Sequence, residues 1–295
     1  MTAVALEPVA IPTVAARPSS LLRRALRLWR TRVGVALVLV LVAVALLGPL
    51  VAPHAPADFV GPPNTGPAPG RPLGTDYLGQ DVLSRFMHGG RTLLTTAVVA
   101  TALGLGVGAA IGLVAAYARN VLDDLLMRGL DVLLAFPQIM LALVAVAVVG
   151  PQAWVIVAAI AITTAPRVAR VTRAAAQPVV ERDFVAAAEA LGVPRRRILT
   201  GELLPNVLSP LLVEASLRLT YSIGVIASLA FLGLSADPNG ADWGVMIQQN
   251  RIALSVQPYG VVTPVLALAL LTMGTGLIGD GISRAAAGID RPKAP

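Results

Sequence analysis

The chain has 295 residues, of which 56% are hydrophobic and 13% are charged, whereas soluble domains carry roughly a quarter charged residues. This balance is typical of an integral membrane protein, and the absence of cysteine excludes disulfide bonds, thiolate metal sites and a cysteine nucleophile. The net charge is +7, but the arginines stand at the ends of apolar runs and aromatic residues make up only 4%, so nucleic-acid binding is not indicated.

Residues 1–32 are predicted to form a tail. Its first half is rich in proline and alanine, which is typical of a disordered segment. Over residues 21–30, arginines and large apolar side chains fall on separate helical faces, which predicts an interfacial helix leading into the membrane. A cleaved signal peptide is not favoured, because the apolar run that follows is longer than the core of a usual signal sequence.

Six apolar stretches approach the length of about 20 residues that a helix needs to cross a bilayer. The fourth is marginal, because Pro166 and Arg167 interrupt it, and we expect its arginines to extend their head groups to the membrane surface. Pro137 lies early in the third and predicts a packing kink, with a hinge as the alternative. The predicted spans are Val33–Val51, Leu93–Ala118, Val132–Val149, Ala153–Val171, Leu211–Leu234 and Val261–Ile282.

The distribution of lysine and arginine sets the expected orientation, because these residues gather on the cytoplasmic side. With the N-terminus inside, only Arg71, Arg85, Arg91 and Arg251 fall in outer segments. Six spans return the C-terminus to the cytoplasm. The predicted fold is therefore all-α and polytopic, divided into a cytoplasmic tail (1–32), a first span (33–52), an extracytoplasmic loop (53–91), a core of five spans (92–285) and a cytoplasmic tail (286–295).

The second span carries glycines at every fourth position: Gly104, Gly108 and Gly112. Small residues on one face let two helices approach closely in lipid, so this stripe predicts helix packing. The run also resembles a dinucleotide-binding fingerprint, but that fingerprint requires a preceding strand, and here the glycines interrupt an apolar helix.

Glu214 and Arg218 are four residues apart within the fifth span. This spacing allows them to pair on one helical face, which offsets the cost of charge at membrane depth. Two interpretations stay open: a polar lining or switch in a translocation path, and an ion pair that only holds helices together.

No catalytic set is recognisable in the sequence. The metalloprotease pattern His-Glu-x-x-His, the nucleophile elbow Gly-x-Ser-x-Gly and the phosphate loop Gly-x4-Gly-Lys-Ser/Thr do not occur, and His54 and His88 make a weak metal site at most. An ATP-driven function would therefore depend on a separate ATPase. An intramembrane enzyme is disfavoured, because only Glu214 and Arg218 are ionisable well within a predicted span.

Residues 183–197 form the most informative segment, because they are polar and lie between two apolar spans. Phe184, Ala187 (or Ala188) and Leu191 recur at helical spacing, and Gly192 is expected to end the helix before a second short piece at 195–197. This pattern predicts a compact cytoplasmic protrusion. A helix lying on anionic lipid is the alternative, which the small alanine-rich face disfavours.

This segment resembles the cytoplasmic coupling loop of bacterial ABC importer permeases, whose pattern is Glu-Ala-Ala, three residues, Gly, and later an apolar-Leu-Pro end. The corresponding residues here are 186–192 and Leu203-Leu204-Pro205, within a segment that spans 183–206. Ala186 replaces the usual Glu, so an acidic contact at that position is not expected.

Further motifs resemble the dipeptide, oligopeptide and nickel group of these permeases, C-type subunit. Residues 73–85 are similar to its Leu-Gly-Thr-Asp-x-x-Gly-Arg-Asp stretch, with Gln80 in place of the common Arg. Residues 231–234, 242–244 and 279–281 also fit, so the resemblance spans about residues 30 to 285.

The resemblance implies a transport subunit in the bacterial plasma membrane, with both termini in the cytoplasm and no enzymatic activity. Expected partners are a B-type permease forming a heterodimer, two ATPase subunits that bind ATP and Mg, an extracytoplasmic binding protein and the lipid bilayer. The cargo implied is short peptides, with nickel, glutathione or another small solute as alternatives. The residues implied in ATPase coupling are Asp183, Phe184, Ala187, Ala188, Glu189, Leu191, Gly192, Val193 and Arg195.

Overall fold

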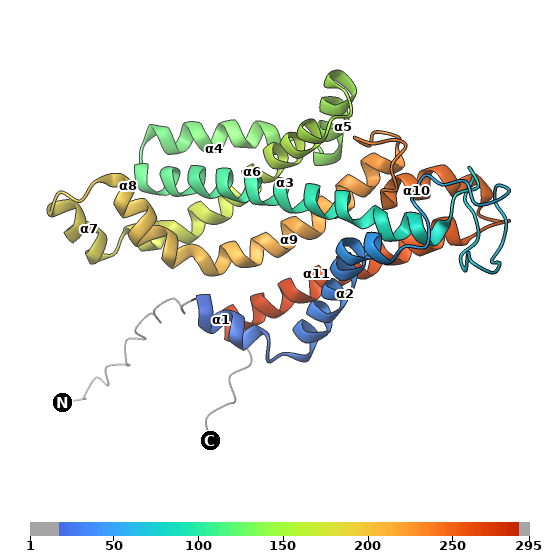
Figure 1. Cartoon of the computed structure of the whole chain (residues 1–295). Helices are drawn as coiled ribbons and strands as arrows, with labels where there is room; N and C mark the ends of the chain where they lie inside the picture. The colour runs from blue at the N-terminus through green and yellow to red at the C-terminus, as the bar shows by residue number, and fades with distance from the viewer. Residues whose placement is uncertain (1–17, 289–295) are drawn as a thin grey trace, which may run out of the picture.

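The computed structural model describes residues 18–288, and its regular structure there is almost entirely helical (Figure 1). Five helices, one of them counted from Arg195 to Phe231, are long and apolar enough to cross a membrane, and a bent pair adds a sixth span. This confirms the all-α membrane fold. The elements are α1 (Pro18–Ala25), α2 (Trp29–Val51), α3 (Val82–Ala118), α4 (Val121–Leu134), α5 (Gln138–Val149), α6 (Ala153–Val180), α7 (Asp183–Ala190), α8 (Arg195–Arg197), the π-helix η1 (Ile198–Leu203), α9 (Leu204–Phe231), α10 (Trp243–Asn250), the 3₁₀ turn η2 (Arg251–Ala253) and α11 (Tyr259–Ala287).

Helices α3 and α6 pack closely along the predicted glycine stripe. A Cβ atom added at Gly104 would lie 2.9 Å from the Thr164 side chain, and one added at Gly108 would lie 2.6 Å from the Ala165 carbonyl oxygen. Backbone-to-backbone contact at this range leaves no room for a side chain, so the glycines set the separation of the two helices. The structure thus identifies α6 as the helix that packs on the glycine stripe of α3.

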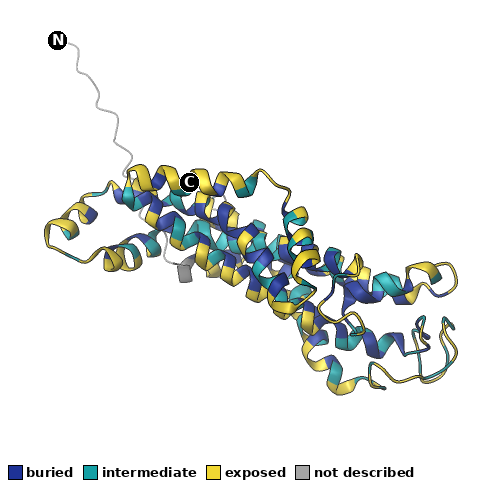
Figure 2. Ribbon diagram, turned by 90° about the horizontal axis from the view of Figure 1, so that it is seen from above, coloured by how far each residue is buried: buried dark blue, intermediate teal, exposed yellow. Residues whose placement is uncertain are grey.

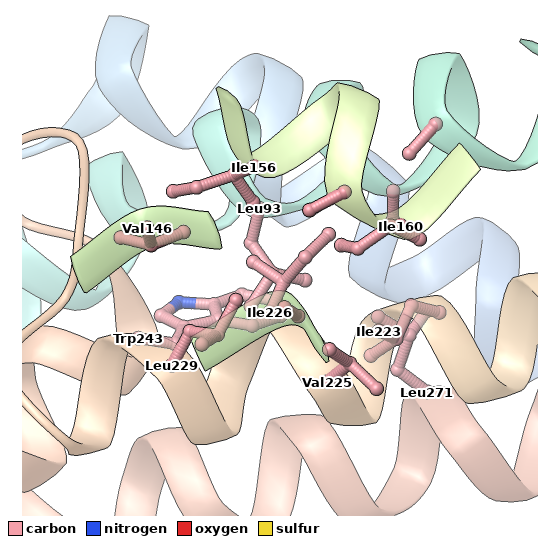
Figure 3. Close-up of a cluster of buried hydrophobic side chains, with 14 of the residues drawn as sticks. Leu93, Val146, Ile156, Ile160, Ile223, Val225, Ile226, Leu229, Trp243 and Leu271 are labelled. Atoms are coloured by element: carbon pink, nitrogen blue, oxygen red, sulfur yellow. The ribbon is translucent and has the colours of Figure 1, made fainter. Parts of the chain in front are cut away.

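The main apolar core lies where α2, α3, α5, α6, α9, α10 and α11 meet. Leu93 of α3, Ile160 of α6, Ile223 of α9 and Leu271 of α11 are almost fully buried there, beside Trp243 of α10 (Figure 3). In lipid such an interior is held by close packing rather than by exclusion of water.

The third span was predicted as one helix over Val132–Val149, and this was wrong. The chain instead forms α4 and α5, which meet at an angle of 79° (Figure 1). The physical reason is Pro137, which lacks an N–H donor and disfavours helical geometry in the residue before it. The break is therefore much sharper than the expected kink.

The extracytoplasmic loop predicted over residues 53–91 ends earlier than expected. Asp81 caps the N-terminus of α3 by accepting a hydrogen bond from the Ser84 N–H at 3.1 Å, so the helix already begins at Val82. The sequence favoured a later start because residues 53–90 are rich in proline and glycine, but in the structure Arg85 is buried in an ion pair within the helix.

The fourth span extends from Ala153 to Val180, beyond the predicted end at Val171. It continues through Pro166, which was expected to interrupt the span, and also through Pro178. The fifth span also begins earlier, at Leu204 rather than Leu211.

The remaining boundaries differ by smaller amounts. The interfacial helix predicted over residues 21–30 ends at Ala25, and the chain turns before α2 begins at Trp29. Helix α11 continues to Ala287, past the predicted end of the core at 285. Residues 1–17 and 289–295 of the two predicted tails lie outside the described residues.

The loop that precedes α3 is folded against α10 by a buried ion pair. The Asp76 carboxylate pairs with Arg85, and Arg85 also donates to the Gly240 carbonyl at 2.8 Å and to Gln249 Oε1 at 3.0 Å. The other Asp76 oxygen accepts the backbone N–H groups of Leu78 and Gln80. The stretch 73–85, which carried part of the resemblance, therefore acts as a structural cap at this end of the bundle.

The segment between α9 and α11 contains α10. Asp242 caps this helix by accepting the Gly244 N–H at 2.8 Å. Burial raises the pKa of Asp242 to about 6, while the backbone hydrogen bonds oppose that change. The indole N–H of Trp243 donates to the Phe86 carbonyl at 2.9 Å, which ties α10 to α3.

Candidate functional site

The predicted cytoplasmic segment protrudes from one end of the helix bundle. Figure 1 places α7 and α8 together at the end opposite α10, beyond the ends of α3, α6 and α9. Helix α7 follows α6 after a turn at Glu181 and Arg182, and η1 joins the segment directly to α9. The segment is thus attached to two membrane helices at once.

One residue, Val185, anchors α7 to the bundle. It is almost fully buried in an apolar cluster with Leu113 of α3, Val180 of α6, and Ile198 and Leu203 of η1. A helix of eight residues is not stable alone in water, so this contact and its neighbours must hold α7 in place. The sequence reasoning missed Val185, although an aliphatic residue within the alanine-rich run was the available signal.

The turn after α7 is a Schellman motif. Gly192 has a φ of +73°, a left-handed conformation that glycine adopts without steric cost. The N–H of Val193 donates to the Ala188 carbonyl and the N–H of Gly192 to the Glu189 carbonyl, both at 3.0 Å. The turn fixes the direction in which the chain leaves α7 and explains why glycine stands there.

Beside this buried contact, part of the exposed surface of α7 is apolar. Leu191 is 82% exposed and Phe184 is also exposed, although large apolar side chains are usually covered (Figure 2). Of the residues implied in coupling, Ala188 and Val193 are half-buried against the bundle. The exposed ones are Asp183, Phe184, Ala187, Glu189, Leu191, Gly192 and Arg195.

A pocket of about 340 Å³ separates this segment from the corner between α3 and α4. Tyr117, in the last turn of α3, lines it together with Glu189 and Arg195 of the segment. A displacement of α7 would therefore act on the end of α3 as well as on α6.

Two ion pairs join α4 to α6 near the same end. Arg173 donates from two nitrogens to the two oxygens of Asp123, both at 2.6 Å, and Arg170 pairs with Asp131. Sequence reasoning missed these pairs, since it expected Arg170 to extend towards the membrane surface. The available signal was a pair of aspartates, Asp123 and Asp131, in an otherwise apolar run that precedes an arginine-rich one.

The intramembrane residues Glu214 and Arg218 lie within ion-pair distance, with 2.8 Å between Oε1 and Nε. The Arg218 Nε–H does not point along a hydrogen bond to the carboxylate, and the guanidinium carbon lies 6.0 Å from the centre of the Tyr221 ring. The contact is compatible with both interpretations of the pair, so its role stays open.

The histidines lie at the start of α3, at the end of the bundle opposite α7. His54 lies 3.4 Å from an Asp81 oxygen, and His88 hydrogen-bonds to the Ser84 carbonyl at 2.8 Å, so both contact the first turn of α3. Within residues 18–288 no group of three His, Asp or Glu side chains is arranged to hold a metal ion.

Comparisons with known proteins identify the family. A family model described as binding-protein-dependent transport system inner membrane component matches residues 108–287. The chain is 36% identical over 256 residues to the di/tripeptide transport system permease protein DppC of Pseudomonas aeruginosa, covering 84% of each chain. It is 34% identical over 261 residues to the glutathione transport system permease protein GsiD of Pectobacterium atrosepticum, covering 87% of each.

A solved structure agrees with the fold. A chain from the MetNI methionine ABC transporter, determined in inward-facing conformations, matches with a TM-score of 0.50 at 18% identity, over 68% of this chain and 94% of that one. Together with the curated relatives, these matches confirm the resemblance to ABC importer permeases. The chain belongs to the family of binding-protein-dependent transport system inner membrane components and is a multi-pass membrane permease subunit, not an enzyme.

Proposed function

We propose that this chain is the C-type permease subunit of an ATP-driven importer for short peptides. It pairs with a B-type permease to form the path, receives cargo from an extracytoplasmic binding protein and is driven by two ATPase subunits. The peptide cargo is supported by the di/tripeptide relative at 36% identity. Glutathione, itself a short peptide, is the second candidate because a glutathione permease is 34% identical. Nickel has no comparable support.

The proposal rests on two features of α7: it exposes apolar side chains, and it is held firmly to the helix bundle. Leu191 has almost no partner in its own chain, while Val185 holds the same helix to the bundle. A partner groove that covers Leu191 and Phe184 gains their burial, which is worth about 1.5–3 kcal/mol for a leucine. ATP and Mg bind to the partner ATPases, and their closure moves α7 together with the membrane helices.

Leu191→Ala is expected to uncouple the importer. In the reconstituted complex, peptide uptake should fall at least ~10-fold, because losing about 1.5–3 kcal/mol of docking energy weakens the contact by that factor or more. ATP hydrolysis by the ATPases and the yield of folded chain should change little, since Leu191 is 82% exposed within the described part of the chain.

Leu50→Ala is the matched control, because Leu50 is equally exposed, at 80%, but lies at the outer end of α2. Uptake should stay normal in that variant. Equal uptake in both variants would contradict ATPase docking on α7.

The proposed orientation places α7 in the cytoplasm and loop 53–81 outside. Because the chain has no cysteine, Ala57→Cys and Ala190→Cys each introduce a single exposed thiol. A membrane-impermeant maleimide should label the first in intact cells and the second only after the membrane is opened. The reverse pattern would refute the orientation.

A further inference from the structure

The break between α4 and α5 lies within a membrane span but is open on one side. Ala135, Phe136 and Pro137 are all exposed, and the helix axis turns by 79° there (Figure 1). Irregular backbone at membrane depth is not tolerated against lipid, because its polar groups would lack partners. It occurs where protein covers it or where it lines a water-filled cavity, so this break faces a partner subunit or the path.

A buried polar side chain lies next to the break. Gln138 is the first residue of α5 and is only 7% exposed, yet neither its amide oxygen nor its amide nitrogen has a hydrogen-bond partner within residues 18–288. Helical side chains lean towards the N-terminus of their helix, so the amide is directed back to the break. An unpaired buried amide costs free energy, which indicates a group that is satisfied by something that binds there.

An unpaired arginine lies on the adjoining turn of α6. Helices α4 and α6 run antiparallel, since Asp123 pairs with Arg173 and Asp131 with Arg170. Arg167 lies one turn before Arg170 on α6. From the antiparallel order of the two pairs we infer that it lies opposite the break that follows α4. Arg167 is exposed and makes no ion pair or side-chain hydrogen bond among the described residues. A guanidinium at this depth is costly against lipid, so it too indicates a wet, protein-lined space.

We propose that the α4–α5 break, with Gln138 and Arg167, forms a subsite in the translocation path that binds the terminal carboxylate of a transported peptide. This rests on the proposed peptide cargo and deepens it. A guanidinium binds a carboxylate through two parallel hydrogen bonds, and the N-terminus of α5 adds a favourable dipole. Broken spans in transporters commonly direct helix N-termini at anionic cargo groups in this way.

The Gln138 amide N–H₂ completes the set of donors. Aspartates Asp123 and Asp131 are already neutralised by Arg173 and Arg170, so they do not repel the carboxylate. A free peptide carboxylate therefore meets net positive charge at the break, whereas a C-terminal amide gains nothing from Arg167.

The test compares a dipeptide with the same dipeptide carrying a C-terminal amide, in the reconstituted complex. For each peptide, uptake by Arg167→Gln is divided by uptake by the unchanged complex, so that the preference of the binding protein cancels. The expected ratio is about 0.1 or less for the free acid and near 1 for the amide. Arg91→Gln is the control, because Arg91 is exposed near the start of α3 and has no part in the proposed subsite, and its two ratios should be equal.

Equal ratios for Arg167→Gln would overturn the subsite and leave Arg167 with a structural role, for instance towards an acidic residue of the second permease. If the unchanged complex moves neither peptide, the proposed peptide import itself fails, which is a different result.

A second measurement does not depend on the binding protein. In the assembled complex, Phe136→Cys should react with a water-soluble thiol reagent, and the free-acid dipeptide should slow this reaction more than the amide does. Val144→Cys, exposed on the side of α5, should not react. An unreactive Phe136→Cys, or equal slowing by the two peptides, would overturn the subsite.

Discussion

Replacing Asp76 by alanine is expected to destabilise the folded chain by about 3–5 kcal/mol, the largest single effect in this protein. Arg85 is only 1% exposed, so the substitution leaves a buried guanidinium without its carboxylate. It also removes the acceptor for two backbone N–H groups of the outer loop. Because Trp243 is buried beside α3 at this end, its fluorescence during thermal unfolding in detergent measures the loss.

The matched control is Asp280→Ala at the other end of the molecule. Asp280 also pairs with arginines, Arg284 at 3.1 Å and Arg30 at 3.5 Å, but its side chain is 44% exposed. Exposed pairs contribute about 0–1 kcal/mol. Similar unfolding temperatures for the two variants would show that the outer cap does not depend on the buried pair.

Gly108→Ala is expected to destabilise the bundle by about 1–3 kcal/mol, which is the usual cost of inserting an extra carbon atom into a tightly packed interior. Its Cβ would lie 2.6 Å from both the Ala165 carbonyl oxygen and the Val168 Cβ, so α3 and α6 would have to separate. The same unfolding measurement in detergent should show a lower transition temperature, and assembly with the partner subunits should fall with it.

Gly106→Ala is the natural comparison, because it lies on the same helix but nothing approaches within 4 Å of the added atom. Alanine is favoured over glycine in a helix interior by roughly 0.5–1 kcal/mol, so this variant should be unchanged or slightly more stable. Equal loss in both variants would mean that helix propensity, and not the α3–α6 contact, decides the outcome.

Much of the fold could be predicted because each membrane helix leaves a local signal in the sequence. Apolar length identified the spans, four-residue glycine spacing identified the packing face of α3, and Gly192 marked the end of α7. The errors came from contacts between distant residues. The buried partner of Arg85 allowed α3 to start early, and α6 continued through Pro166, which was expected to interrupt it.

The site was predictable in part for the same reason. The exposed face of α7 follows from helical spacing, but its anchor does not, since Val185 is defined by residues of α3, α6 and η1 that are far away in sequence. Likewise, Asp123 and Arg173 are 50 residues apart, and only the folded chain shows that they join α4 to α6. The break at Pro137 was visible in sequence, but its 79° angle was not.

The contacts suggest how movement of α7 reaches the membrane helices. Helix α7 continues from α6, α6 is packed closely on α3 through Gly108, and α4 is held to α6 by two ion pairs. These helices therefore move as one body when α7 is displaced. The break at the far end of α4 would then shift with them, which links the proposed carboxylate subsite to the ATPases.

The central claim is that an ATPase subunit grips the outer face of α7. The most direct test places a photo-activated cross-linking residue at Leu191 in the assembled complex. Illumination should join this chain to an ATPase subunit, with a yield that changes when ATP is bound, and the same residue at Leu50 should give no such product. Cross-linking of Leu191 to lipid alone would contradict the claim and favour an interfacial helix.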